Sequence, residues 1–149
     1  MLPLIFSSSL AAERRDELEE LMFFNPQQGA HESGINSSIR DYGFPKIVLE
    51  GSSLTIGIEG RDIQTLYAFI ERTGNPELVG VIVYTRTSPD TIALLHMAVK
   101  PEYSYSSGYK NELVVVRMLT QLRKIARRIN GIHKLSIAYG GKLITRAEV

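Results

Sequence analysis

Residues 91–139 read TIALLHMAVKPEYSYSSGYKNELVVVRMLTQLRKIARRINGIHKLSIAY, and this stretch decides the fold. The apolar run at 91–99 predicts a strand, and a loop rich in serine follows it. Residues 111–129 repeat apolar side chains at helical spacing, and 134–139 predict a second strand. Strand, loop, helix and strand in this order predict a right-handed crossover between two parallel strands. The loop would present unpaired backbone N–H groups at the positive end of a helix dipole, which suits a phosphate.

The composition is that of a globular protein. The chain has 149 residues, of which 44% are hydrophobic and 22% charged, with a net charge of +1. These values predict a single domain over residues 1–149, with a helical and loop part at 1–45, the sheet and its crossover helix at 46–139, and a tail at 140–149. The absence of cysteine excludes disulfides and thiolate nucleophiles. The balanced charge disfavours nucleic acid as a partner.

The first 45 residues predict little regular structure apart from one helix. Residues 1–6 are apolar but too few for a signal peptide, so we expect a strand or a plug on the core. No stretch approaches the ~20 apolar residues of a membrane span, and we therefore expect a cytoplasmic protein. Ser7, Ser8 and Ser9 predict the N-cap of a helix that runs to about Phe23. Residues 27–45 predict an irregular segment with a short helix near 37–42, either a binding loop or a mobile connection.

From Lys46 onward the pattern is that of β-structure. Residues 46–50 and 53–59 predict a hairpin around Gly51-Ser52. Residues 64–72 and 78–86 predict two more strands, joined to each other and to 91–99 by short turns. Antiparallel strands followed by one helical crossover predict an α+β fold, with a mixed, mainly antiparallel sheet and flanking helices.

The order of these elements and the local amino-acid sequence resemble the GNAT superfamily of N-acetyltransferases. The lead-in Ala98-Val99-Lys100-Pro101-Glu102-Tyr103 matches the family's phrase before its cofactor loop. Gly108 to Leu113 can be laid on the glycine-containing loop of the family, with Lys110 in place of the second glycine and a serine in place of the usual Arg or Gln. The resemblance covers about residues 46–139.

This resemblance implies that acetyl-CoA, or a related acyl-CoA, binds as co-substrate. Its pyrophosphate would lie on a loop cradle of Ser104, Ser106, Ser107, Gly108, Tyr109 and Lys110, and its pantetheine arm would pair with backbone groups of Met97 and Val99. The family's glutamate base would fall at Ala93, so a base would have to come from elsewhere, such as Glu59, Glu71 or a water chain. A serine-rich loop that binds nothing, on a fold that has lost its ligand, is the alternative.

Two side chains are candidates for proton transfer, each with a structural alternative. His96 titrates near neutral pH and by strand alternation shares a face with Leu94 and Ala98; it is either a base or a buried, hydrogen-bonded residue. Tyr139 is the nearest substitute for the family's acid, or simply an aromatic strand residue. No spacing of His, Asp or Glu predicts a metal site.

The resemblance therefore implies an acyl-CoA-dependent N-acyltransferase acting on an unknown amine, a small molecule or a peptide. The alternative is a catalytically inactive binding or protein-interaction module with the same fold. An uncovered sheet edge at the C-terminal side would favour a homo-oligomer.

Overall fold

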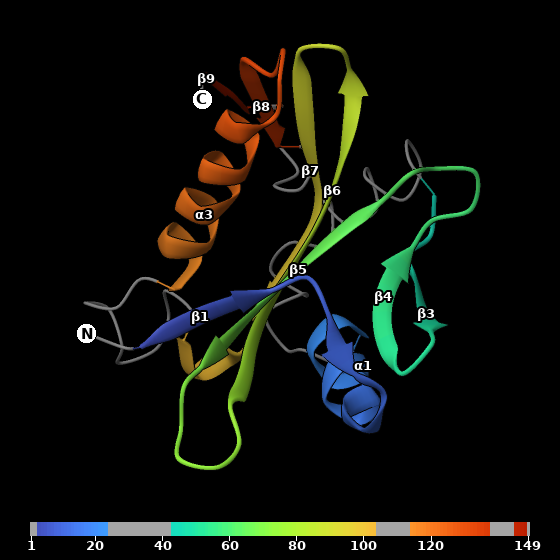
Figure 1. Cartoon of the computed structure of the whole chain (residues 1–149), viewed down its shortest axis with the longest axis vertical. Coiled ribbons are helices and arrows are strands. Elements are labelled where there is room, and N and C mark those ends of the chain that lie inside the picture. Colours follow the sequence, from blue (N-terminus) through green and yellow to red (C-terminus); the bar gives the residue numbers. More distant parts are fainter. Residues whose placement is uncertain (1–2, 24–42, 104–113, 138–144, 149) are drawn as a thin grey trace.

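The computed structural model describes residues 3–23, 43–103, 114–137 and 145–148. Its main feature is a six-stranded sheet in the spatial order β1-β5-β6-β7-β8-β9 (Figure 1). The strands are β1 (Leu4–Ser7), β5 (Gln64–Ile70), β6 (Glu77–Ser88), β7 (Thr91–Val99), β8 (Lys134–Ile137) and β9 (Thr145–Glu148). Every neighbouring pair is antiparallel except β7 and β8, which are parallel.

A smaller, three-stranded sheet has the order β2-β4-β3. Its strands are β2 (Leu10–Ala11), β3 (Lys46–Glu50) and β4 (Ser53–Gly57), and the helices are α1 (Arg15–Phe23), α3 (Val114–Arg128) and the 3-10 turns Ala12–Arg14 and Pro101–Tyr103. The turn between β3 and β4 contains Gly51 at φ +62°, a left-handed conformation that favours glycine. Helix α3 lies against one face of the large sheet, and α1 with the small sheet lies against the other (Figure 1).

Both faces of the large sheet are therefore covered, which explains why β6 and β7 are almost continuously apolar. The α3 face carries Ile82, Tyr84, Ile92, Leu94 and Val99, packed on Met118 and Leu122 of the helix. The small-sheet face carries Tyr67, Phe69, Val81, Val83 and Ala98, packed on Leu18 and Leu54. The chain thus builds one core on each side of β5, β6 and β7.

Helix α3 packs closely because its buried residues recur every fourth position. Val114, Met118, Leu122 and Ala126 are buried, while Arg123, Lys124, Arg127 and Arg128 are exposed. A Cβ on Gly80 of β6 would lie 2.6 Å from Sδ of Met118. The absence of a side chain at Gly80 is therefore what lets Met118 approach the sheet.

Side chains of β5 join the two sheets. The Thr65 hydroxyl accepts a hydrogen bond from the Ile56 N–H at 3.0 Å, and the Tyr67 hydroxyl donates to the Leu54 carbonyl at 2.9 Å. Both side chains are buried. The first bond satisfies a backbone group of β4 beyond the two residues that pair with β2, and the second adds a donor to the carbonyl of Leu54, which pairs with Leu10 of β2.

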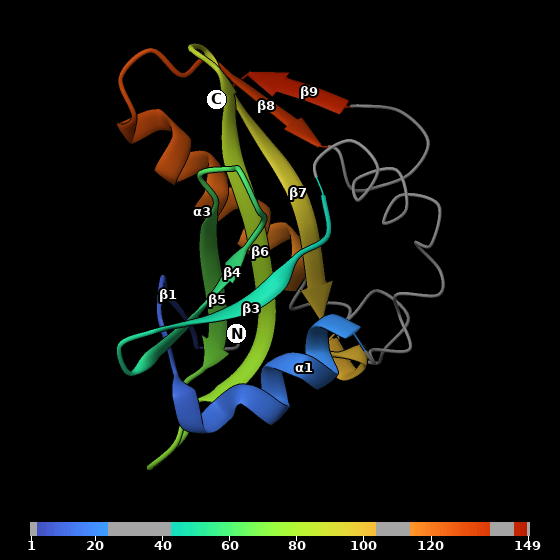
Figure 2. The ribbon, with the colours of Figure 1, turned by 90° about the vertical axis from the view of Figure 1, so that its right-hand side faces the viewer.

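The predicted parallel pair is confirmed: β7 and β8 are joined through α3 and paired from Thr91–Lys134 to Leu94–Ile137. The two strands lie side by side along the whole described length of β8 (Figure 2). The broader prediction of an α+β fold with a mixed, mainly antiparallel sheet is confirmed as well. The hairpin around Gly51-Ser52 is also present.

Three predicted details were wrong. The helix begins at Arg15 rather than after the serines, because Leu4–Ser7 pairs with β5 and Leu10–Ala11 with β4. The Ser7 hydroxyl accepts the Ser9 N–H at 3.1 Å, so it caps a bend between two strands and not a helix. Residues 145–148, expected in a tail, form β9 and cover the outer edge of β8. The short helix expected near 37–42 lies outside the described residues.

Candidate functional site

A β-bulge divides β7 at Leu95. Leu94 pairs with Tyr84 and His96 pairs with Val83. Tyr84 and Val83 are consecutive in β6, so Leu95 is an extra residue of β7 without a partner of its own in β6. The bulge changes the alternation of side chains. Leu94 packs on the α3 face, whereas Val83, the partner of His96, packs on the small-sheet face. His96 therefore shares a face with Ala98 but not with Leu94, and the prediction from simple alternation was wrong for Leu94.

Beyond the bulge, the backbone of Met97 is directed away from β6. The Lys100 N–H donates to the Val79 carbonyl at 2.8 Å, so Lys100 and Val79 form a hydrogen-bonded pair. Hydrogen-bonded and non-hydrogen-bonded pairs alternate along antiparallel strands, and this bond therefore shows which residues of β7 bond to β6. Counting back along the register, Ala98 and His96 direct their backbone groups to β6, and Met97 and Val99 direct theirs to the side of β8. The described pairing with β8 ends at Leu94. Met97 lies beyond Leu94, where the structure describes no residue of β8.

His96 is buried and has an unusual environment for an imidazole. Its side chain is 5% exposed, and burial lowers its pKa to about 4. Within the described part of the chain its Nε2 atom has no hydrogen-bond partner. The predicted burial is confirmed, but no described residue makes the expected hydrogen bond to Nε2. The imidazole is neutral at neutral pH, so it offers a weak hydrogen-bonding group and no charge.

A polar network anchors the exit of β7 where the predicted cofactor loop begins. The Glu77 carboxylate accepts hydrogen bonds from Arg72 Nε at 2.9 Å, from Lys100 Nζ at 3.1 Å and from the Tyr103 hydroxyl at 3.2 Å. Burial raises the pKa of Glu77, but the hydrogen bonds from Arg72 and Lys100 outweigh it and leave the pKa below its ordinary value. Lys100 and Tyr103 thus tie the lead-in phrase to the turn between β5 and β6.

Arg72 and Glu77 were not singled out from the sequence. Opposite charges on either side of a short turn were the signal that could have identified them. Tyr103, the last residue of the lead-in phrase, has its hydroxyl engaged by Arg72 at 3.2 Å and by Glu77. Its role here is structural.

No acidic side chain lies on β7. Ala93, at the position of the family's base, is fully buried against Ile58, Leu95 and Ile63. The alternative bases Glu59 and Glu71 are exposed, in the segments that precede and follow β5. The described residues therefore do not bring a carboxylate to the bulge.

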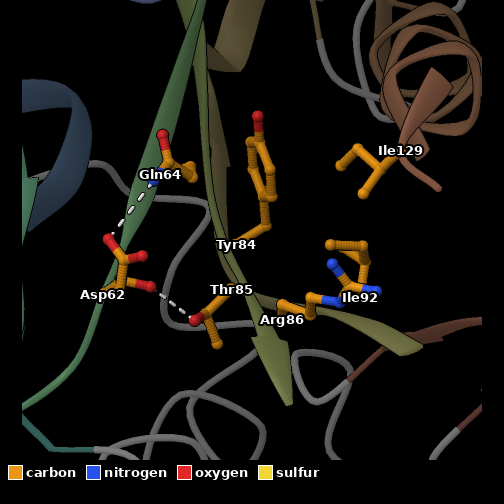
Figure 3. A pocket seen from close by; sticks show the side chains of 7 residues that line it. All are labelled: Asp62, Gln64, Tyr84, Thr85, Arg86, Ile92 and Ile129. Carbon is orange, nitrogen blue, oxygen red and sulfur yellow. Dashed lines mark hydrogen bonds between the residues drawn. The ribbon is translucent and has the colours of Figure 1, made fainter. Parts of the chain in front are cut away.

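A cavity of about 320 Å³ lies at the other end of β7, beside the C-terminal end of α3 (Figure 3). Its lining residues are Asp62, Gln64, Tyr84, Thr85, Arg86, Ile92 and Ile129. The polar groups are largely engaged with one another: Thr85 donates to the Asp62 carbonyl at 2.6 Å, Gln64 to the Asp62 carboxylate at 3.4 Å, and Arg86 to the Asn130 carbonyl at 3.0 Å. Tyr84, which pairs with Leu94 beside the bulge, is among the lining residues, whereas no residue from the start of α3 is.

Seven of the predicted site residues lie outside the described residues. They are the loop residues Ser104, Ser106, Ser107, Gly108, Tyr109 and Lys110, and the candidate acid Tyr139. Of the others, Met97, Val99 and His96 lie on β7, and Met97 and Val99 have the backbone orientation that pairing with an added strand requires.

A scan against models of known protein families and a search of curated proteins found no match. Within the described ranges, no group of three or more His, Asp or Glu residues could hold a metal ion. None of the helices in the described part of the chain is long and apolar enough to cross a bilayer.

Proposed function

We propose that the chain binds an acyl-CoA along the C-terminal half of β7, on the side of β8, and that it transfers the acyl group to an amine. The single observation that carries this proposal is the backbone of Met97, which is directed away from β6 and lies beyond the last residue of β7 that the described part of β8 pairs with. Pantetheine is an extended chain with two amide groups, and it can hydrogen-bond such a strand as a further strand would. The pyrophosphate would then fall toward the start of α3, where helix N–H groups favour an anion.

The bulge supports the same location. Bulges occur preferentially beside active sites, because they re-aim side chains and interrupt pairing. Here the bulge lies between the β8-paired half of β7 and the half that contains Met97. A thioester bound along Met97 would have its carbonyl close to residues 94–96.

The chemistry would rest mainly on positioning. The amine nitrogen attacks the thioester carbonyl, the C–N bond forms, the C–S bond breaks, and the amine proton leaves while the CoA thiolate takes up a proton. With Ala93 at the base position and the pKa of His96 at about 4, neither side chain is an effective base at neutral pH. The acceptor must therefore arrive largely as the free amine, and the rate should rise with pH up to the pKa of that amine.

Transfer can be tested by following release of the CoA thiol from acetyl-CoA in the presence of a panel of primary amines and lysine peptides. The protein contains no cysteine, so a thiol reagent reports CoA alone. We expect thiol release that depends on both protein and amine, an acetylated amine by mass spectrometry, and a rate that increases between about pH 6.5 and pH 9. A flat pH profile would contradict the positioning mechanism.

A binding module without transfer activity is the second candidate, and the buried Ala93 favours it. In that case acetyl-CoA would bind and stabilise the fold, but no amine in the panel would be acetylated. Failure of acetyl-CoA to bind at millimolar concentration would reject both candidates.

A further inference from the structure

Within the described part of the chain, strand β3 is an open edge. Among those residues it pairs only with β4, and it lies on the outer side of the small sheet (Figure 1). Its sequence is KIVLE, with Val48 37% exposed and Leu49 58% exposed. Exposed apolar edge strands are templates for pairing with another strand, and proteins usually block or cover them.

The turn fixes which backbone groups of β3 face outward. Glu50 and Ser53 close the two-residue turn, and the pair that closes such a turn is hydrogen-bonded. By alternation, Glu50, Val48 and Lys46 direct their N–H and C=O groups to β4. Ile47 and Leu49 direct theirs to the open edge, so the edge offers two donors and two acceptors.

We propose that β3 pairs with β3 of a second copy of this chain, antiparallel and centred on Val48. In that register Ile47 of one copy lies opposite Leu49 of the other, so all four outward-facing residues of the two strands form hydrogen-bonded pairs. Val48 lies opposite Val48 of the second copy and covers its exposed methyl groups. The three-stranded sheets join into one sheet of six strands.

The charges of β3 fit the same register. Lys46 and Glu50 are both exposed and both lie on the face of Val48, two residues to either side of it. Pairing about Val48 therefore places each Lys46 opposite a Glu50 of the second copy, in non-hydrogen-bonded positions where side chains approach most closely. One strand thus carries both halves of a self-complementary pattern.

Other registers fit less well. Pairing centred on Ile47 would place Leu49 opposite Pro45, which has no N–H to donate. Pairing centred on Leu49 would place Ile47 opposite Gly51 in the turn. Both also separate Lys46 from Glu50.

Charge reversal tests the proposal without disturbing the core. The wild-type chain should sediment as a dimer at high micromolar concentration. Lys46→Glu and Glu50→Lys should each weaken dimerisation roughly ten-fold or more, because like charges then lie opposite each other at two places. An equimolar mixture of the two variants should associate at least as strongly as the wild type, since every cross-strand pair is again of opposite sign. Circular dichroism should show an unchanged fold in each variant.

The double variant Lys46→Glu/Glu50→Lys provides the matched control, because it exchanges the two charges and should recover the wild-type dimer. A monomeric wild type at millimolar concentration would overturn the proposal. A dimer that is unaffected by either single charge reversal, or a mixture that fails to recover association, would overturn it equally, because the contact would then lie elsewhere.

Discussion

Lowering the pH from about 8 to 4.5 should reduce the free energy of unfolding of the wild-type protein by roughly 2 to 3 kcal/mol through His96 alone. Burial lowers the pKa of this imidazole from its ordinary 6.5 to about 4 in the folded state. Between these two values the unfolded chain binds a proton that the folded chain does not. Stability is therefore complete above about pH 6.5 and falls as the pH drops toward 4.

Chemical denaturation at a series of pH values measures this effect. His96→Leu should remove most of the pH dependence in that window, and it should not lower stability at pH 8 by as much as a normal core substitution, because Nε2 has no described partner to lose. His133→Leu is the matched control, since His133 is exposed and its removal should leave the wild-type profile. An identical pH profile in wild type and His96→Leu would show that His96 is not buried as described. Glu77, with its lowered pKa, contributes a separate loss only below about pH 4.5.

Gly108→Asp should weaken acetyl-CoA binding by about 100-fold or more. The reason is that a carboxylate in the loop before α3 adds bulk and negative charge where backbone N–H groups would have to approach a pyrophosphate. Titration calorimetry with acetyl-CoA measures the change in affinity. Asn75→Asp introduces the same charge at an exposed bend between β5 and β6, and it should bind like the wild type. Equal affinity for Gly108→Asp and wild type would place the pyrophosphate elsewhere.

The crossover at the centre of the fold could be predicted from the sequence, because both of its strands and its helix have strong and different periodicities. The apolar run at 91–99 and the i, i+4 spacing of Met118, Leu122 and Ala126 leave little choice of secondary structure. The hairpin around Gly51 was predictable for the same reason, since a turn residue separates two alternating segments.

The bulge at Leu95 could not be predicted. It inserts one residue without any change in residue type, so the run LLHMA looks like regular alternation. The face assigned to His96 relative to Leu94 was wrong for this reason alone. The role of Ser7 was also ambiguous in the sequence, because a serine hydroxyl can cap either a helix or a bend. In the structure, residues 4–7 pair with the distant strand β5, and Ser7 therefore caps a bend.

The candidate site was predicted only in part. The resemblance alone puts the family's base position at Ala93, and this stays a prediction; the structure shows that Ala93 is buried. The Glu77 network could not be predicted from the sequence. It joins the turn between β5 and β6 to the exit of β7, and contacts between residues so far apart in sequence depend on the register of the whole sheet.

The most direct test of the central claim is the backbone amide of Met97, observed by NMR during titration with acetyl-CoA. The account predicts a large shift of this amide and its protection from hydrogen exchange, because the pantetheine arm would accept its N–H. The amides of His96 and Ala98, which are directed toward β6, should change little in exchange rate. Saturating acetyl-CoA that leaves the Met97 amide unshifted and its exchange rate unchanged would contradict the account.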